Sequence, residues 1–335
     1  MSAAAGWLPP AADRSLSGVL RVCGSPAMGE LMAVWAQDFG RIHAGIHVRT
    51  DLRGTSTAQF GLQCGTAELA LSGRAASTYE QYGIIRRSQL LPIEIPVAIG
   101  SHDRIGKSAA LAVFVHRDNP VAGLSIAQLD GIFGAERSGG WGRIAWETGA
   151  ARGPEGDIRR WGQLGLTGRW ADAPIIPYAP PALHPGGVSF FQRRVLGGAD
   201  TVNPRTREYP DRHAMIAALT QDRFGIAYAA LGYAKDGVRA IPLSDGGPLI
   251  DLDRRTVADL SYPLSRFAYA YAAPDSPVGD PAPLNPAALA FLQFVLSRPG
   301  QQLVASTDYH PLPGSVADRH RARLTVPAEP IGAAP

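Results

Sequence analysis

The chain has 335 residues, of which 45% are hydrophobic and 18% are charged, so it can bury one large core or two ordinary ones and is neither disordered nor fibrous in composition. Its formal net charge is +3 and its arginines are scattered along the chain, which gives no support for nucleic-acid binding. No apolar run approaches the roughly 20 residues that a membrane-spanning helix needs.

Strand and helix patterns alternate from the start of the chain. The run Val19–Cys23 alternates as a strand does, and residues 28–39 then carry apolar side chains at the spacing of a helix packed on a sheet. Ser25 lies between them and suits the N-cap position of that helix. Residues 45–50 predict a second strand, and the small-residue loop 53–57 precedes a second helix. This rhythm indicates a parallel α/β sheet.

The same patterns continue along the rest of the chain. Further strands are predicted at residues 91–98, 110–116, 174–178, 224–230, 237–242 and 267–272. Helices are predicted at residues 125–133, 188–196 and 286–296. The segment Gly134–Arg160 has no period and is expected to be an exposed excursion, and the chain from Val316 onward is expected to be loosely held.

The sequence offers little for catalysis or metal binding. Cys23 and Cys64 are the two cysteines, and they form either one disulfide or two separate thiols. Neither has metal-ligand spacing, and the eight histidines are dispersed, so no metal site and no cofactor are expected. No catalytic motif occurs in a suitable setting, and we therefore expect that the protein is not an enzyme.

Three loops place small or hydroxyl residues at the start of a helix, where unpaired N–H groups suit an oxyanion. These loops contain Gly24 and Ser25; Thr55, Ser56 and Thr57; and Gly186 and Gly187. Each of them is also open to an ordinary role in capping or turning the chain. Arg74 is either a fixed, two-pronged cation for the same anion or a solvated surface group.

Several short motifs in order resemble the phosphate-binding proteins of ABC phosphate transporters. The resemblance runs from about Val19 to Pro313. The motifs lie at residues 53–58 with 65–67 and 74, 119–133, 161–170, 225–228, 262–266, and 296–313. The resemblance implies two α/β lobes with the type II periplasmic-binding-protein fold, joined by a two-strand hinge and closing over a ligand in the cleft.

The implied boundaries follow from the hinge, whose crossings are expected near Ala110 and Phe267. The first lobe would comprise residues 18–110 and 267–315, the second lobe residues 111–266, and a tail residues 316–335. The resemblance also implies a protein of the periplasm or cell envelope that delivers phosphate or a related small anion to a membrane ABC permease, and we expect it to be a monomer. No leader is visible, so either one has been removed or the protein is cytosolic.

The predicted ligand shell departs from the family pattern. The first loop reads Gly24-Ser-Pro-Ala27 and lacks one hydroxyl, and the third reads Pro185-Gly-Gly187 with no arginine in residues 179–184. His184 either replaces part of that charge or is an ordinary loop residue. The expected ligand contacts are Ser25, Thr55, Ser56, Thr57, Arg74, His184, Gly186 and Gly187. The alternative is an envelope interaction or sensor protein that has lost or changed this specificity.

Overall fold

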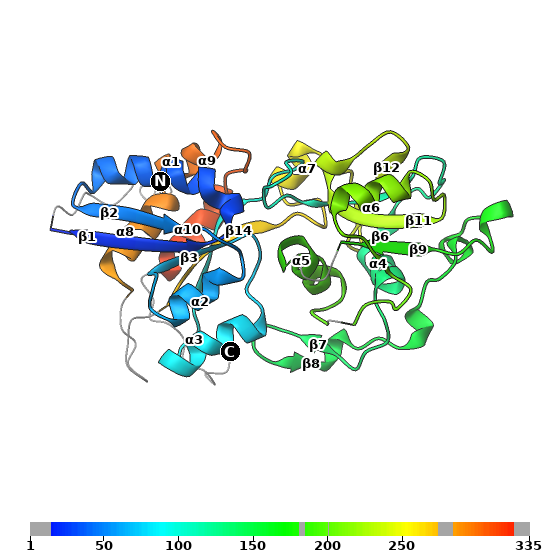
Figure 1. Cartoon of the computed structure of the whole chain (residues 1–335), viewed down its shortest axis with the longest axis horizontal. Helices are drawn as coiled ribbons and strands as arrows, with labels where there is room; N and C mark the ends of the chain where they lie inside the picture. The colour runs from blue at the N-terminus through cyan, green and yellow to red at the C-terminus, as the bar shows by residue number, and fades with distance from the viewer. Residues whose placement is uncertain (1–14, 181–184, 200, 274–283, 325–335) are drawn as a thin grey trace. The chain divides into compact units, whose positions relative to one another are not determined.

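The structure is a computed structural model that describes residues 15–180, 185–199, 201–273 and 284–324 (Figure 1). The chain folds into two compact units, one made of Met1–Ser101 with Phe267–Pro335 and the other of His102–Arg266. It therefore passes between the units at residues 101–102 and 266–267. The sequence predicts these two crossings near Ala110 and Phe267.

A five-stranded sheet of order β2-β1-β3-β14-β4 forms the centre of the first unit. The strands are β1 (Gly18–Gly24), β2 (Ile46–Asp51), β3 (Leu69–Ser72), β4 (Ile93–Ile99) and β14 (Phe267–Ala272). β1 pairs in parallel with β2 and β3, whereas β14 runs antiparallel to β3 and β4. The parallel strands β1, β2 and β3 therefore end at the same edge of the sheet.

Helices cover both faces of this sheet (Figure 1). They are α1 (Gly29–Ile42), α2 (Thr57–Gln63), α3 (Thr78–Ser88), α8 (Pro286–Val295), α9 (Arg298–Val304) and α10 (Gly314–Arg323). On one face, the Phe39 ring of α1 meets the ring of Phe291 in α8, with centroids 5.1 Å apart. On the other face, Leu62 of α2 and Ile84 of α3 pack in a buried cluster with Tyr271 of β14.

The end of the described chain differs from the expectation of a loosely held tail. Residues 316–324 lie in or directly after α10, and Ala317 and Leu324 are buried. The helix is strongly polar, with His320, Arg321 and Arg323 in its last turn, so its few apolar positions give no clear periodic signal. Residues 325–335 lie outside the described part of the chain.

The second unit repeats the sheet order of the first. Its sheet runs β10-β9-β11-β5-β12. The strands are β5 (Leu111–His116), β9 (Ile176–Ala179), β10 (Arg207–Glu208), β11 (Gly225–Ala230) and β12 (Val238–Ile241). β9 pairs in parallel with β10 and β11, and β5 runs antiparallel to β11 and β12. β9, β10 and β11 thus correspond to β1, β2 and β3, and β5 corresponds to β14.

The remaining elements of the second unit surround this sheet. Its helices are α4 (Ile126–Phe133), α5 (Pro185–Val195), α6 (Arg212–Leu219) and α7 (Arg254–Ala258). Two short pairs add β6 (Leu124–Ser125) with β13 (Leu243–Ser244) and β7 (Gly140–Trp141) with β8 (Trp146–Glu147). Short 3-10 turns lie at Pro26–Met28, Thr148–Ala150, Pro154–Gly156, Trp161–Leu164, Gly168–Trp170 and Leu231–Tyr233.

The segment 134–160 is more firmly held than an exposed excursion. Arg137 donates to both carboxylate oxygens of Asp130 at 2.7 Å, and its side chain is only 6% exposed. Arg152 donates to Asp157 at 2.8 Å with a side chain that is 11% exposed. The segment is therefore fixed by buried ion pairs, which hydrophobic periodicity cannot reveal.

Candidate functional site

Two of the three predicted loops, together with the segment that carries Arg74, lie at one edge of the first sheet, because β1, β2 and β3 are parallel and end together. The amide of Gly54 donates to the carbonyl of Gly24 at 2.9 Å, and this bond joins the loop after β2 to the loop after β1. The amide of Ser25 donates to the carbonyl of Leu71 at 2.9 Å, and this bond joins the loop after β1 to β3. The structure thus brings Ser25 and the Thr55–Thr57 loop together.

The hydroxyl groups at this edge differ in whether they already make a hydrogen bond within the protein. Ser25 is 3% exposed and is the N-cap of the 3-10 turn Pro26–Met28, whereas the N-cap of α1 is Met28 and not Ser25 as predicted. Its side chain makes no capping bond and no hydrogen bond within the described chain. Ser56 precedes α2 and likewise makes no side-chain capping bond. Thr57 donates its hydroxyl to the Gly54 carbonyl at 2.7 Å, while Thr55 is half-buried. Ser25 and Ser56 therefore keep donors that a ligand can use.

Arg74 lies beside the same edge, just after β3, but its charge is balanced within the unit. It is 5% exposed, and its Nη1 and Nη2 donate to the two carboxylate oxygens of Glu80 at 2.8 Å each. Burial alone raises the pKa of Glu80, but the hydrogen bonds and charge of Arg74 outweigh it and hold that pKa below its ordinary value. The role of Arg74 as a ligand contact stays a prediction.

The same carboxylate also starts helix α3. Glu80 accepts a hydrogen bond from the amide of Ser77 at 2.7 Å, and the Ser77 hydroxyl accepts one from the amide of Glu80 at 3.3 Å. This reciprocal arrangement is a capping box, and its Ser-x-x-Glu pattern is legible in the sequence. That pattern is the signal by which sequence reasoning could have found the partner of Arg74.

In the second unit, Gly186 and Gly187 belong to the first turn of α5 rather than to a separate turn. Gly187 is buried and Gly186 is half-buried. The first N–H groups of a helix have no acceptor within the helix, so this turn presents donors as the sequence predicts. His184 lies outside the described residues.

Sequence reasoning missed Arg212, the first residue of α6, which lies next to this turn. A Cβ atom placed on Gly187 would be 3.5 Å from Nη2 of Arg212. The neighbours meet because β9 and β10 are parallel and adjacent, so the helices that follow them begin at one edge. Residues 179–184 contain no arginine, whereas the strand–loop–helix pattern around Asp211 is the signal in the sequence for a second helix start at this edge.

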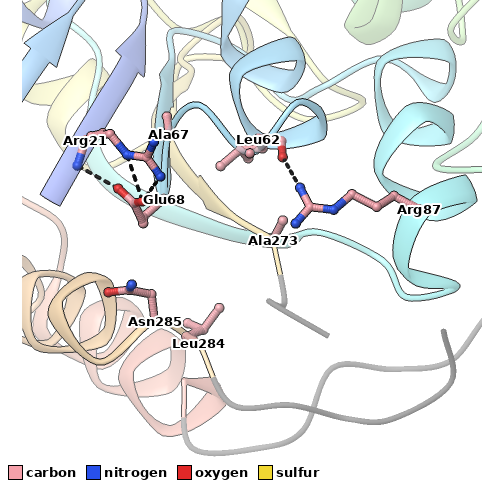
Figure 2. Close-up of a pocket in the computed structure, with 9 residues that line it drawn as sticks. Arg21, Leu62, Ala67, Glu68, Arg87, Ala273, Leu284 and Asn285 are labelled. Carbon is pink, nitrogen blue, oxygen red and sulfur yellow. Dashed lines mark hydrogen bonds and ion pairs between the residues drawn. The ribbon is translucent and has the colours of Figure 1, made fainter. Parts of the chain in front are cut away.

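A separate hollow of about 120 Å³ in the first unit contains none of the predicted residues (Figure 2). The backbone N–H of Arg21 donates to Glu68 at 2.7 Å, and its Nε donates to the same carboxylate at 2.9 Å. Arg87 donates to the Leu62 carbonyl at 3.0 Å. These charges are engaged in bonds that hold the unit together, so we do not assign the ligand to this hollow.

Other expectations concern membrane spans, metals and thiols. Within the described ranges, no helix is both long and apolar enough to cross a membrane. Over the same ranges, no cluster of three or more His, Cys, Asp or Glu residues is suited to a metal ion. Cys23 and Cys64 are both free thiols.

Comparison with known proteins identifies the family. The sequence model of the PBP superfamily domain matches residues 9–299. The chain is also 32% identical over 308 residues to the phosphate-binding protein PstS of Pseudomonas aeruginosa, an alignment that covers 91% of this chain and 86% of that relative. The chain belongs to the phosphate-binding protein family of this superfamily. The resemblance stated from the sequence motifs is therefore confirmed.

Solved structures support the fold of this family member. An ABC-type phosphate transport receptor from Vibrio cholerae superposes with a TM-score of 0.57 at 19% identity, covering 87% of this chain and 99% of that one. PstS from Borrelia burgdorferi gives a TM-score of 0.58 at 16% identity, covering 89% and 100%. At these identities the similarity is one of fold, and it confirms the predicted α/β class of type II binding proteins.

Proposed function

We propose that this family member is the substrate-binding protein of an ABC-type uptake system and that it captures phosphate or a closely related oxyanion. The observation that carries the proposal is its 32% identity, over most of both chains, to the phosphate-binding protein PstS of Pseudomonas aeruginosa. The corollaries are a location in the periplasm or cell envelope, a membrane ABC permease as partner, and a monomeric state.

The chemistry of the loops supports an oxyanion ligand. A desolvated oxyanion needs donors for its lone pairs and compensation for its charge. Ser25 and Ser56 retain uncommitted hydroxyls at one edge of the first unit, and Gly186 and Gly187 lie in the first turn of α5 in the second. The Ser25 residue is 3% exposed, and its hydroxyl has no partner among the described residues, so it keeps a donor for an anion.

The state of Arg74 sets the expected strength of binding. Its charge is shared with Glu80, and a missing charge-assisted bond costs about 1.5–3 kcal/mol, or roughly one to two powers of ten in affinity. We therefore expect weaker capture of phosphate than a family member with a complete set of contacts would give. The same ion pair favours, as the second candidate, an envelope interaction or sensor protein that has lost ligand capture.

Calorimetric titration with phosphate, arsenate and sulfate tests the proposal. We expect phosphate to bind wild-type protein and Ser25→Ala to weaken its binding about 10-fold, since a hydrogen bond to a charged ligand is lost. Ser306→Ala is the matched control, because Ser306 is exposed in the same unit and its hydroxyl already donates to Leu303. If wild type binds no anion in the panel and native mass spectrometry finds none retained, the proposal is wrong and the sensor function is favoured.

A further inference from the structure

Helix α5 begins beside a cation that the next helix supplies. Arg212 is the first residue of α6, and its Nη2 lies 3.5 Å from the position that a Cβ of Gly187 would occupy. The second unit has the strand order of the first, so the start of α6 corresponds to the start of α2. Arg212 therefore occupies the place in the second unit that Thr57 occupies in the first.

The charge of Arg212 is not neutralised by any described residue. Its guanidinium has no ion-pair partner and no hydrogen-bond acceptor in the described chain. The adjacent Asp211 caps α6 by accepting the amide of Ala214 at 2.9 Å. By contrast, Arg137 of the same unit is paired with Asp130 and Arg152 with Asp157. A half-buried arginine without a counter-ion, beside the first turn of a helix, is suited to an anion.

Tyr228 of β11 supplies a second uncommitted donor next to α5. It is 4% exposed, and its ring stacks on Phe191 of α5 with centroids 3.8 Å apart, yet its hydroxyl has no hydrogen-bond partner in the described chain. Every other buried tyrosine of the described chain donates its hydroxyl to a protein acceptor; these are Tyr178, Tyr262, Tyr271 and Tyr309. The Tyr228 hydroxyl is not one of the fully buried polar atoms that lack a partner in the described chain, so a small ligand can reach this uncommitted donor.

Charge links Tyr228 to Arg212. Burial raises the pKa of the Tyr228 hydroxyl, the positive charge of Arg212 lowers it in part, and the negative charge of Glu208 raises it. Arg212 thus borders Gly187, and its positive charge and the negative charge of Glu208 both act through space on the Tyr228 hydroxyl. The three groups offer a guanidinium, a hydroxyl and backbone amides, all of which are donors.

We propose that Arg212 is the cationic ligand contact of the second unit and that Tyr228 and the first turn of α5 donate hydrogen bonds to the same ligand. The inference rests on the proposed function, because it assigns these donors to the same phosphate-like oxyanion. Arg212 would take the place of the arginine that the family pattern has before the third loop, because residues 179–184 of this chain contain no arginine. A guanidinium and a hydroxyl together require a ligand with at least two acceptor oxygens, which a tetrahedral oxyanion provides.

Phosphate titration of the full-length variants Arg212→Gln and Tyr228→Phe tests the assignment, alongside thermal unfolding without phosphate. We expect Arg212→Gln to weaken phosphate binding at least 20-fold, Arg212→Lys to restore part of it, and Tyr228→Phe to weaken it 3- to 10-fold. The apo Tyr228→Phe protein should melt no lower than wild type, because it loses a hydroxyl that has no partner. Arg223→Gln is the control, since Arg223 is exposed in the same unit and reaches only Asp118 at 3.4 Å; it should change affinity less than twofold.

The outcomes separate the two claims. If wild type binds phosphate and Arg212→Gln binds it equally well, this assignment is wrong while the proposed function stands. A Tyr228→Phe protein that melts well below wild type in the absence of phosphate would show that the hydroxyl is structural, which also overturns the assignment of Tyr228. If wild type binds no oxyanion, the proposed function fails, and this inference fails with it.

Discussion

Arg74 and Glu80 form a two-pronged ion pair, in which each guanidinium nitrogen lies 2.8 Å from a different carboxylate oxygen. The two side chains are only 6% and 14% exposed. Because Glu80 also accepts the amide of Ser77, the pair fixes the turn between β3 and α3. An arginine that the sequence offers as a ligand contact thus has a structural task as well.

Breaking this pair should destabilise the first unit. Arg74→Ala or Glu80→Gln leaves one buried group without its partner, and we expect a loss of about 2–4 kcal/mol in the free energy of unfolding, measured with urea. Arg160→Ala is the control: it breaks an exposed pair with Asp172, whose side chains are 60% and 93% exposed, and should cost under about 0.5 kcal/mol. Equal, small losses in all three variants would contradict the structural task.

The same pair should make stability depend on acid. The folded protein holds the pKa of Glu80 below its ordinary value, so the contribution of Glu80 is complete above the ordinary carboxylate pKa and is lost as the pH falls through the folded one. Unfolding by urea from pH 6 to pH 3 should therefore show a smaller acid-induced loss in Glu80→Gln than in wild type. An identical slope in both proteins would count against this linkage.

Gly24 is fixed by both its backbone and its surroundings. Its φ is +122°, and a Cβ there would lie 2.1 Å from the carbonyl oxygen of Leu71. Gly24→Ala must therefore push β1 from β3, and we expect a loss of about 3 kcal/mol or more. Gly29→Ala in α1 is the control, because its Cβ would only contact Leu52 Cδ1 at 3.8 Å, and it should be neutral or slightly stabilising. Similar melting temperatures for both variants would refute this reading.

Local patterns gave much of the fold. β14 occupies the predicted residues Phe267–Ala272, and β5 starts at Leu111, one residue later than the start of the predicted strand 110–116. Both were predictable because alternating or continuous apolar runs bounded by turns are local signals. The four-residue strand Leu69–Ser72 is buried throughout, so it has no alternation, and it was not predicted as a strand. α10 was missed because most of its residues are polar or charged and its few apolar positions form no clear stripe.

Only those parts of the candidate site that lie within a single loop could be predicted from the sequence. The positions of Ser25 and Ser56 follow from the strand–loop–helix pattern. The neighbours of these loops do not, since Arg212 reaches Gly187 through the pairing of β9 with β10, which joins segments separated along the chain. That Glu80 balances Arg74 was legible in the capping pattern but requires knowing that both side chains are buried.

The two thiols should react at different rates. The Sγ of Cys23 lies 3.4 Å from the carbonyl oxygen of Ala58, and burial, followed by the charge of Asp51, raises its pKa to about 11. At pH 8 only about one Cys23 in a thousand is then a thiolate, whereas Cys64 is exposed. Iodoacetamide followed by peptide mass spectrometry should modify Cys64 first, and Cys64→Ser should leave the native protein almost unlabelled. Equal labelling of both cysteines would contradict the burial of Cys23.

His320 should give the fold a second acid-sensitive step. Its side chain lies in α10, where Nδ1 is buried without a hydrogen-bond partner among the described residues. Burial, with the charges of Arg323 and Arg319, lowers its pKa from 6.5 to about 4. Between these values the unfolded chain binds a proton that the folded protein does not, so stability is complete above pH 6.5 and declines until about pH 4.

The variant His320→Gln isolates this step, because an amide does not titrate in that range. For a half-buried group we expect wild type to lose about 1–2 kcal/mol between pH 7 and pH 4.5 beyond what the variant loses, measured by urea unfolding at each pH. His47→Gln, an exposed histidine of β2 in the same unit, should follow the wild-type curve. If His320→Gln keeps the full wild-type slope over this range, the side chain is solvated, and the packing of α10 described here is wrong at that residue.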